Sequence, residues 1–250
     1  MGKQLNFSYI SHQSLLGRAL RWPFQFIPGE TILPILQGRL RGARWIVGSL
    51  NHGAWLGSYE LKKRELFEKT VRPGFVVFDI GAHVGYYTLL ASRLVGAEGT
   101  VIAFEPLPRN LRYLKQHLDM NKASNVRLIE AAVTRSTGTA RFEQRPSHAM
   151  GGLSMQGDLT VATVSIDELY AKADIPRPDV IKMDIEGGEA DALLGMRAVL
   201  EQSKPTIFLA THGPEVHQRC LEFLGSLGYA LTPVNGPSLE ESDEVFCTPG

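Results

Sequence analysis

The chain has 250 residues, of which 44% are hydrophobic, so it is long enough for one large domain with a substantial core. Basic and acidic side chains both number 26, so the net charge of the whole chain indicates no class of partner. The charge is unevenly distributed: residues 1–72 carry eleven basic and four acidic side chains, and the rest carry fifteen and twenty-two. A basic first third is typical of a solvated surface, and also of a segment that meets an anionic substrate or a lipid surface.

The cysteine content and the hydropathy pattern bear on the compartment. Cys220 and Cys247 are too few for a disulfide framework and lack metal-ligand spacing. No stretch approaches the ~18 apolar residues of a membrane span, and the N-terminus lacks the basic-then-apolar pattern of a signal peptide. We therefore expect a cytoplasmic protein without a transmembrane segment. Its basic, aromatic N-terminus is compatible with a peripheral membrane contact.

The first 70 residues are predicted to form an N-terminal extension, a lid or cover over the domain formed by residues 71–250. Residues 1–58 are irregular, with frequent Gly and Pro, and indicate short helices and loops. A helix is expected from Ser58 to Lys69, before the turn signal at Arg72-Pro73-Gly74. Four aromatic residues of the extension either stack on a ligand or pack the extension onto the domain: Trp22, Phe24, Phe26 and Trp45.

From residue 75 onward, strand-like and helix-like segments alternate. Apolar residues at helical spacing predict helices at 86–94, 107–118, 193–200 and 216–227. Short apolar, β-branched runs predict buried parallel strands at Phe75–Ile80, Thr100–Phe104, Val126–Glu130, Val180–Asp184 and Pro205–Ala210. Further β-like segments lie near Thr139–Glu143 and Thr160–Val164, on either side of a Gly-rich loop at Met150–Gly157, and at Tyr229–Pro233 and Val245–Thr248, which would form a closing hairpin.

This alternation predicts an α/β fold with a doubly wound, mostly parallel seven-stranded sheet and helices on both faces. Ligands of such sheets bind at the carboxyl ends of the strands, near the switch in strand order. The residues that end the strands are therefore the candidates for a binding site.

The first parallel strand ends in Asp79-Ile80-Gly81-Ala82-His83-Val84-Gly85 and runs directly into a helix. Glycines at such a turn let a ligand approach the backbone, and the helix N-terminus presents free N–H groups. The dinucleotide fingerprint needs glycine at positions 81, 83 and 86, but positions 83 and 86 are His and Tyr, so the fingerprint fails. An acid followed by G-x-x-x-G favours S-adenosylmethionine, a cofactor with a cationic amine and no pyrophosphate.

The second strand ends in Phe104-Glu105-Pro106. A carboxylate at this position can accept both ribose hydroxyls of a nucleoside, as the acidic residue does in nucleotide-binding folds. Alone, Glu105 would also serve as an N-cap for the helix that starts near Pro106. Because Glu105 follows the Asp79–Gly85 turn in the sequence, the nucleoside-binding interpretation is favoured over the N-cap.

These motifs resemble the FkbM-type class I methyltransferases. The resemblance covers about residues 55 to 215 and rests on residues 77–88, Phe104-Glu105-Pro106, Glu130-Ala131-Ala132-Val133, Ser165-Ile166-Asp167-Glu168-Leu169 and residues 181–189. One departure is His83, where the family usually has Asn; a neutral His offers one donor and one acceptor. The resemblance implies a Rossmann-like fold and methyl transfer from S-adenosylmethionine to a hydroxyl of a sugar or other secondary metabolite.

Cofactor contacts are also implied by the resemblance. It places Asp79, Gly81 and Gly85 around the methionyl part, Glu105 on the ribose, and residues 131–133 beside the adenine. The pair Tyr59-Glu60 matches a family position that closes over the cofactor. The full expected set is Tyr59, Glu60, Asp79, Gly81, His83, Gly85, Tyr87, Thr88, Glu105, Pro106, Ala131, Ala132 and Asp184.

Three acids follow the Val180–Asp184 strand within six residues: Asp184, Glu186 and Glu189. If Ile185 points into the structure, Asp184 and Glu186 both face the ligand. Asp184 would then orient the donor amine while Glu186 serves the acceptor, or both would bind a divalent cation such as Mg²⁺. Glu186 and Glu189 would otherwise only stabilise the positive end of the next helix.

The Pro205–Ala210 strand is followed by His212, which is well placed for general base catalysis, with an ordinary pKa near ~6.5. The candidate catalytic residues are therefore His212, Asp184 and Glu186, and the proton of an acceptor hydroxyl would go to His212 or leave with the help of the cation. His52 and Tyr59 are weaker candidates. The remaining histidines are expected at the surface: His12, His117, His148 and His217.

The partner is expected to be a small-molecule acceptor, bound by the N-terminal extension and the Met150–Gly157 loop. No nucleic acid partner is expected, because the Asn/Asp-Pro-Pro-Tyr/Phe motif is absent. Two other functions stay open. An NAD(P)-dependent oxidoreductase shares the sheet but not the intact fingerprint, and a catalytically degenerate protein would bind S-adenosylmethionine without turnover. The sequence carries no signal for the oligomeric state.

Overall fold

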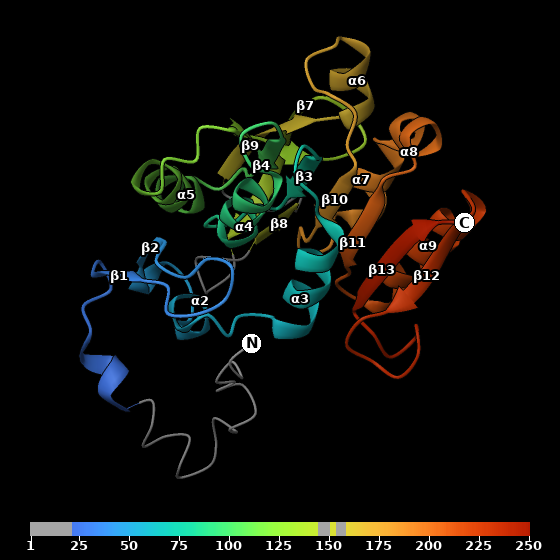
Figure 1. Cartoon of the computed structure of the whole chain (residues 1–250). Helices are drawn as coiled ribbons and strands as arrows, with labels where there is room; N and C mark the ends of the chain where they lie inside the picture. Colours follow the sequence, from blue (N-terminus) through green and yellow to red (C-terminus); the bar gives the residue numbers. More distant parts are fainter. Residues whose placement is uncertain (1–21, 145–150, 154–158) are drawn as a thin grey trace.

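The computed structural model describes residues 22–144, 151–153 and 159–250. A seven-stranded sheet has the order β12-β13-β11-β10-β3-β4-β5 (Figure 1). The five strands from β11 to β5 pair in parallel, and β13 pairs antiparallel with both β11 and β12. The bounds are β3 Val76–Ile80, β4 Thr100–Phe104, β5 Val126–Ile129, β10 Val180–Met183, β11 Thr206–Ala210, β12 Tyr229–Pro233 and β13 Glu244–Pro249. The predicted mostly parallel seven-stranded sheet is confirmed, including its closing hairpin.

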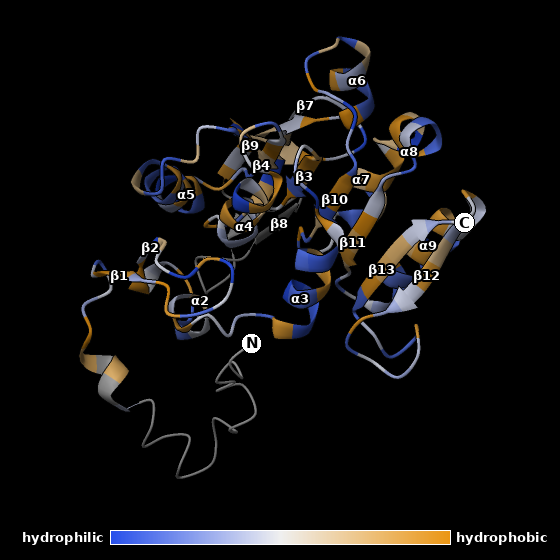
Figure 2. Cartoon of the chain, in the orientation of Figure 1, coloured by the Kyte–Doolittle hydropathy of each residue, from blue (hydrophilic) through white to orange (hydrophobic). Residues whose placement is uncertain are grey.

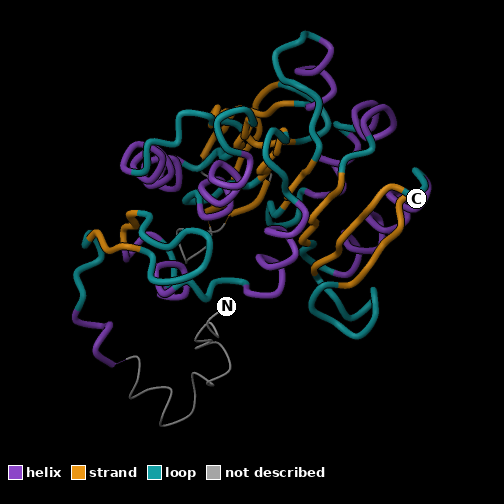
Figure 3. Tube along the Cα trace, in the orientation of Figure 1, coloured by secondary structure: helices purple, strands orange, loops and turns teal. Residues whose placement is uncertain are grey.

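Helices flank both faces of this sheet (Figure 3). Side chains alternate along a strand, so Val77 of β3 joins the core formed with α3 and α4, whereas Phe78 and Ile80 join the core formed with α6 to α9. Figure 2 shows the hydrophobic colour concentrated in central strands such as β10 and β11, while α3 is largely hydrophilic. The bounds are α3 Leu61–Thr70, α4 Tyr86–Val95, α5 Pro108–Met120, α6 Ile166–Ala171, α7 Glu189–Leu194, α8 Arg197–Ser203 and α9 Pro214–Ser226.

The strand order reverses at β3, with β4 and β5 on one side and β10 and β11 on the other. Ligands of open α/β sheets bind at the carboxyl ends of the strands beside such a reversal. β3 ends just before Gly81, β4 just before Glu105 and β10 just before Asp184. The fold therefore brings the three sequence motifs to one edge of the sheet.

The single helix predicted over residues 193–200 is instead two short helices, α7 and α8, separated at Gly195 and Met196. The carbonyl of Gly195 accepts hydrogen bonds from the backbone N–H of Asp167 and the hydroxyl of Ser165, both at 2.9 Å. The carboxylate of Asp167 in turn accepts from two backbone N–H groups at the start of α8. Hydrogen bonds of Ser165 and Asp167, at the start of α6, thus mark the end of α7 and cap α8.

A four-stranded sheet between β5 and β10 was only partly expected. It has the order β6-β9-β7-β8, with β6 Ala132–Val133, β7 Gly138–Gln144, β8 Gly151–Leu153 and β9 Leu159–Val164. The predicted loop at Met150–Gly157 is wrong for residues 151–153, which pair antiparallel with residues 142–144 of β7. The rest of that predicted loop lies outside the described residues.

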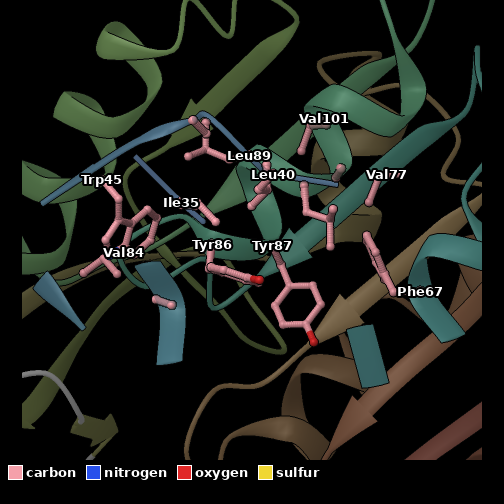
Figure 4. Packing of buried hydrophobic residues seen from close by; sticks show 14 of the residues in the cluster. Ile35, Leu40, Trp45, Phe67, Val77, Val84, Tyr86, Tyr87, Leu89 and Val101 are labelled. Carbon is pink, nitrogen blue, oxygen red and sulfur yellow. The ribbon is translucent and has the colours of Figure 1, made fainter. Parts of the chain in front are cut away.

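The N-terminal region contributes a small hairpin and short helices that pack on the α3–α4 face. Figure 4 shows Ile35, Leu40 and Trp45 beside Tyr86 and Leu89 of α4, in one shared core. The elements are η2 Trp22–Phe26, β1 Ile32–Pro34, β2 Arg44–Ile46, η3 Val47–Ser49 and α2 His52–Leu56. The helix expected from Ser58 begins only at Leu61. Within the part of the chain that the structure describes, no helix has the length and hydropathy needed to cross a membrane.

Among the four aromatic residues named for the N-terminal region, Trp45 is fully buried, and its ring stacks on His117 of α5 with ring centroids 3.9 Å apart. Phe24 packs edge-on against Trp55. Trp22 and Phe26 are 60% and 67% exposed. Trp45 therefore packs this region onto the domain, as one of the two alternatives predicted, whereas the ring contacts of Phe24 stay within the N-terminal region.

Candidate active site

A pocket of about 480 Å³ opens at the carboxyl ends of β3, β4 and β10, within the size range of small-molecule sites. The β3–α4 turn and the start of α5 line one side of the pocket. An apolar wall is formed by Ala132 of β6, Ala131 just before it, and Phe142 of β7. Residues 48–51 and Tyr59 line it from the N-terminal region. Seven separate segments of the chain thus line one cavity at the reversal of strand order.

Three residues that line the pocket have a left-handed backbone although none is glycine: Glu60 (φ 42°), His83 (φ 53°) and Glu186 (φ 60°). This conformation costs a non-glycine residue roughly 1–2 kcal/mol, and such residues gather at functional sites. Asn and His tolerate this region better than most residues. His83 can therefore stand where the family usually has Asn without a change in the turn.

Glu105 is buried and extends from the end of β4 toward the β3–α4 turn. Its Oε2 accepts the His83 N–H at 2.8 Å, and its Oε1 accepts from Leu107 N at 2.9 Å and Asn110 Nδ2 at 3.2 Å. Burial raises the pKa of Glu105, and these three donors oppose the rise. A carboxylate accepts about four hydrogen bonds, so these three contacts leave acceptor capacity on Glu105 for a ribose hydroxyl.

Asp79 does not line the pocket. Its side chain lies under α4, where Oδ2 accepts from the hydroxyl of Thr88 at 2.6 Å and Oδ1 lies 3.4 Å from Lys182 Nζ. Lys182 is adjacent in the β10–β3 register, lines the pocket, and donates to the carbonyl of Gly81 at 2.9 Å. The predicted contacts of Asp79 and Thr88 with the cofactor would therefore be indirect, through Lys182 and the Gly81 turn.

A buried lysine connects three elements beside the pocket. Lys63 of α3 lies 2.6 Å from Glu60, 2.5 Å from Glu244 of β13 and 4.0 Å from Asp184 Oδ2. Burial alone would lower the pKa of Lys63, but these three carboxylates outweigh it and raise the pKa. Burial alone would raise the pKa of Asp184, but the nearby cations, above all Lys182 and Lys63, outweigh burial and lower the pKa.

His212 lies between three carboxylates after β11. Its Nδ1 is 2.8 Å from Oε1 of the fully buried Glu189, and its Nε2 is 3.7 Å from both Asp184 Oδ1 and Glu186 Oε2. The hydrogen bond with Glu189 is the main cause that raises the pKa of His212. The three predicted catalytic residues are thus brought together, with Glu189, for which helix stabilisation was one predicted alternative, as a fourth member.

Most of the predicted cofactor residues share the pocket. Those that line it are Tyr59, Glu60, Gly81, His83, Tyr87, Glu105, Pro106, Ala131, Ala132 and Asp184. Asp79, Gly85 and Thr88 do not line it, and His212 lies just behind Asp184 and Glu186. Pocket residues that the sequence interpretation did not name include Arg109, Asn110, Phe142 and Lys182, whereas residues 48–51 belong to the N-terminal extension that was expected to bind the acceptor. Only Lys182, a charge inside an apolar strand, carried a signal in the sequence.

The expectation that His117 lies at the surface is wrong, because His117 is fully buried. Its Nδ1 lies 2.7 Å from the carbonyl of Val84 in the β3–α4 turn, and its Nε2 accepts the Ile46 N–H at 3.1 Å. One neutral tautomer satisfies both contacts and ties β2 to the turn. His217, also expected at the surface, is half-buried and bonds Thr211 and the carbonyl of Leu239.

Burial lowers the pKa of His117 to about 4, below the ordinary value of 6.5. The unfolded chain therefore binds a proton at His117 between these two values while the folded chain does not, so stability falls as the pH falls below 6.5. From pH 7 to pH 5 the loss should be about 2 kcal/mol. Urea unfolding of the wild type and His117→Gln at both pH values measures it: the variant should lose about 2 kcal/mol less, and parallel losses would contradict the assignment.

The architecture defines the class first. A mostly parallel seven-stranded sheet with β13 antiparallel between β11 and β12 is the class I methyltransferase fold. It is similar to an FkbM methyltransferase from Methylobacillus flagellatus (TM-score 0.50, 20% identity, 74% of this chain and 50% of that one). It is also similar to an S-adenosylmethionine-dependent O-methyltransferase from Thermotoga maritima (TM-score 0.50, 14% identity, 92% and 81%). At these identities the likeness shows the fold alone.

Residues 79–231 match the Methyltransferase FkbM domain, and the chain belongs to this family. It is 32% identical over 128 residues to the hexuronic acid methyltransferase AglP of Haloferax volcanii, covering 50% of this chain and 52% of that protein. It is 21% identical over 144 residues to methyltransferase 1 of Beauveria bassiana, covering 48% and 57%. The chain spans about half the length of these curated relatives.

Proposed function

We propose that this chain is an S-adenosylmethionine-dependent methyltransferase that methylates a hydroxyl oxygen of a small molecule such as a sugar or secondary metabolite. The observation that carries the proposal is one pocket lined by both a nucleoside-binding carboxylate, Glu105, and the acids Asp184 and Glu186. The similarity to a relative named as a hexuronic acid methyltransferase supports a sugar acceptor.

The residues of the pocket fit the proposed cofactor. Glu105 retains capacity for one ribose hydroxyl, as its three described hydrogen bonds indicate. Ala131, Ala132 and Phe142 offer an apolar surface for adenine. Lys182 and Asp184 both line the pocket with opposite charge, which suits the carboxylate and the amine of a methionyl group. When bound, S-adenosylmethionine supplies an electrophilic methyl group on a sulfonium.

The protein's part in such a reaction is to position the acceptor and to exclude water. Methyl transfer would form a C–O bond and break the C–S bond, whose electrons would stay on sulfur. The hydroxyl proton would pass to His212 or to solvent water beside Asp184 and Glu186. Residues 48–51 and Tyr59 cover the pocket from the N-terminal region and would contact the acceptor.

The cofactor assignment is tested by binding. Wild type should bind S-adenosylhomocysteine in calorimetry and gain thermal stability from it, with no response to NADH. Glu105→Ala should weaken S-adenosylhomocysteine by about 10- to 100-fold, since a hydrogen bond to a charged group contributes about 1.5–3 kcal/mol. The matched control is Glu130→Ala, an exposed acid after β5 paired with Lys115, which should leave the affinity unchanged. A response to NADH instead would favour the oxidoreductase.

The acceptor is tested separately, with methyl-labelled S-adenosylmethionine and a panel of hexuronic acids and neutral sugars. Label in an alkali-stable ether product supports O-methylation of a hydroxyl. Label lost as methanol on alkaline hydrolysis would indicate a carboxyl ester and contradict it. Binding of S-adenosylhomocysteine without transfer to any acceptor would favour the catalytically degenerate alternative.

A further inference from the structure

Three potential metal-ligand atoms converge between the ends of β10 and β11. Asp184 Oδ1, Glu186 Oε2 and His212 Nε2 belong to side chains whose ligand atoms all lie within 4.8 Å of one another. The two separations from His212 Nε2 are both 3.7 Å. All three residues are half-buried, and the two acids line the proposed active-site pocket.

These separations are longer than hydrogen bonds but match ligands of one cation. A hydrogen bond from an imidazole nitrogen to a carboxylate spans about 2.7–2.9 Å. Carboxylate oxygens and imidazole nitrogens lie about 2.0–2.2 Å from Mg²⁺, Mn²⁺ or Zn²⁺, which places two ligand atoms of the same ion about 3 to 4 Å apart. The geometry at His212 Nε2 therefore leaves room for an ion rather than for a direct bond.

Glu189 fixes which nitrogen of His212 faces the acids. Glu189 is fully buried, and its Oε1 accepts from Gly187 N at 3.0 Å and lies 2.8 Å from His212 Nδ1. The Nδ1 proton is thus directed to Glu189, and Nε2 faces Asp184 and Glu186, so in the neutral ring its lone pair points at the two acids. A metal-binding histidine usually donates its other N–H to a carboxylate in this way. Two carboxylate oxygens and Nε2 then face one another, an arrangement that a cation stabilises, whether a proton on Nε2 or a metal ion.

Two lysines near this group, Lys63 and Lys182, are held mainly by other partners. Lys63 lies 4.0 Å from Asp184, on the opposite carboxylate oxygen, Oδ2, and is engaged at 2.6 Å and 2.5 Å by Glu60 and Glu244. Lys182 donates to the carbonyl of Gly81 and pairs with Asp79. The Oδ1 atom of Asp184 faces His212.

We propose that Asp184, Glu186 and His212 bind a divalent cation of the Mg²⁺ or Mn²⁺ class, with Glu189 orienting His212. The two carboxylates suit both ions, whereas the imidazole favours Mn²⁺ over Mg²⁺, and three protein ligands leave positions for water or an acceptor hydroxyl. Bound there, the hydroxyl becomes more acidic, and its proton passes to solvent water. The cation site does not depend on the proposed methyl transfer, but this role for it does.

The experiment is Mn²⁺ binding to the full chain without cofactor or acceptor, followed by electron paramagnetic resonance of free Mn²⁺. We expect one saturable site from which Mg²⁺ displaces Mn²⁺. His212→Ala and Asp184→Asn should abolish it, and Glu189→Gln should weaken it about 10- to 100-fold. Glu215→Gln, an exposed acid three residues from His212, is the matched control and should bind as wild type. Circular dichroism shows that each variant is folded.

Two results would overturn the site: wild type that binds no Mn²⁺ at millimolar concentration, or His212→Ala and Asp184→Asn that bind it as wild type does. S-adenosylhomocysteine binding, measured on the same samples, keeps the two proposals apart. Cofactor binding without Mn²⁺ binding would contradict the cation site and leave the proposed function intact. Mn²⁺ binding without cofactor binding would contradict the proposed function and leave the cation site intact.

Discussion

Replacing Lys182 by methionine is expected to lower the free energy of unfolding by about 3–5 kcal/mol, because the buried carboxylate of Asp79 then loses its cationic partner. Lys182 and Asp79 are neighbours in the β10–β3 register, and their side chains are only 7% and 1% exposed. Methionine keeps most of the apolar volume of the lysine stem, so the loss reports mainly on the charge. Urea unfolding followed by circular dichroism measures it.

The matched control for this change is Lys115→Met. Lys115 and Glu130 form a closer ion pair, 2.7 Å, but both side chains are about half exposed, at 53% and 51%. Solvent screening limits such a pair to about 1 kcal/mol or less. Adding Asp79→Asn to Lys182→Met should recover part of the loss, because it removes the unpaired charge. Equal losses for Lys182→Met and Lys115→Met would show that the buried pair contributes no more than a surface pair.

The strand ends could be predicted because buried parallel strands leave a plain pattern. β3, β4, β10 and β11 are short apolar runs, and a polar or glycine residue follows each within two positions. Parallel strands end at one edge, so Gly81, Glu105 and Asp184 had to meet there once the topology was right. The sequence thus located the pocket without any distance being known.

The direction of Asp79 could not be predicted in the same way. Asp79 stands between Phe78 and Ile80, so strand alternation places it on the face of Val77, under α4. Whether a carboxylate there contacts a ligand or a side chain of the protein depends on which residue of the neighbouring strand lies beside it. The β10 register puts Lys182 beside it, and register is not visible in a single sequence.

The individual residues of the N-terminal extension that line the pocket could not be predicted, for a different reason. β1 and β2 have three residues each, too few for a periodic pattern. Their position depends on contacts with α5 more than 70 residues away, such as the Ile46 N–H on His117 and the pairing of Arg44 with Asn121. His117 looked like a surface residue because its partners lie outside its own helix.

Replacing Gly81 by alanine is expected to lower the free energy of unfolding by about 2–5 kcal/mol and to abolish measurable S-adenosylhomocysteine binding. Gly81 has φ +80°, and an added Cβ would overlap the backbone carbonyl of Asp184 and lie 2.9 Å from Ile185 Cγ2. The left-handed backbone alone costs alanine about 1–2 kcal/mol, and forcing two backbones apart costs about 1–3 kcal/mol more. The same displacement would move Asp184 within the pocket. Urea unfolding and calorimetry measure the two effects.

Gly74→Ala separates the two causes. Gly74 has φ +83°, but no atom lies within 4 Å of its added Cβ, so this variant carries only the backbone penalty of about 1–2 kcal/mol and should bind S-adenosylhomocysteine normally. If Gly81→Ala matched Gly74→Ala in both measurements, close contact between the two turns would not matter. A larger loss at Gly81 would instead show that the β3 and β10 turns must touch. The glycine expected to admit a ligand to the backbone would then also set the distance between the β3 turn and Asp184.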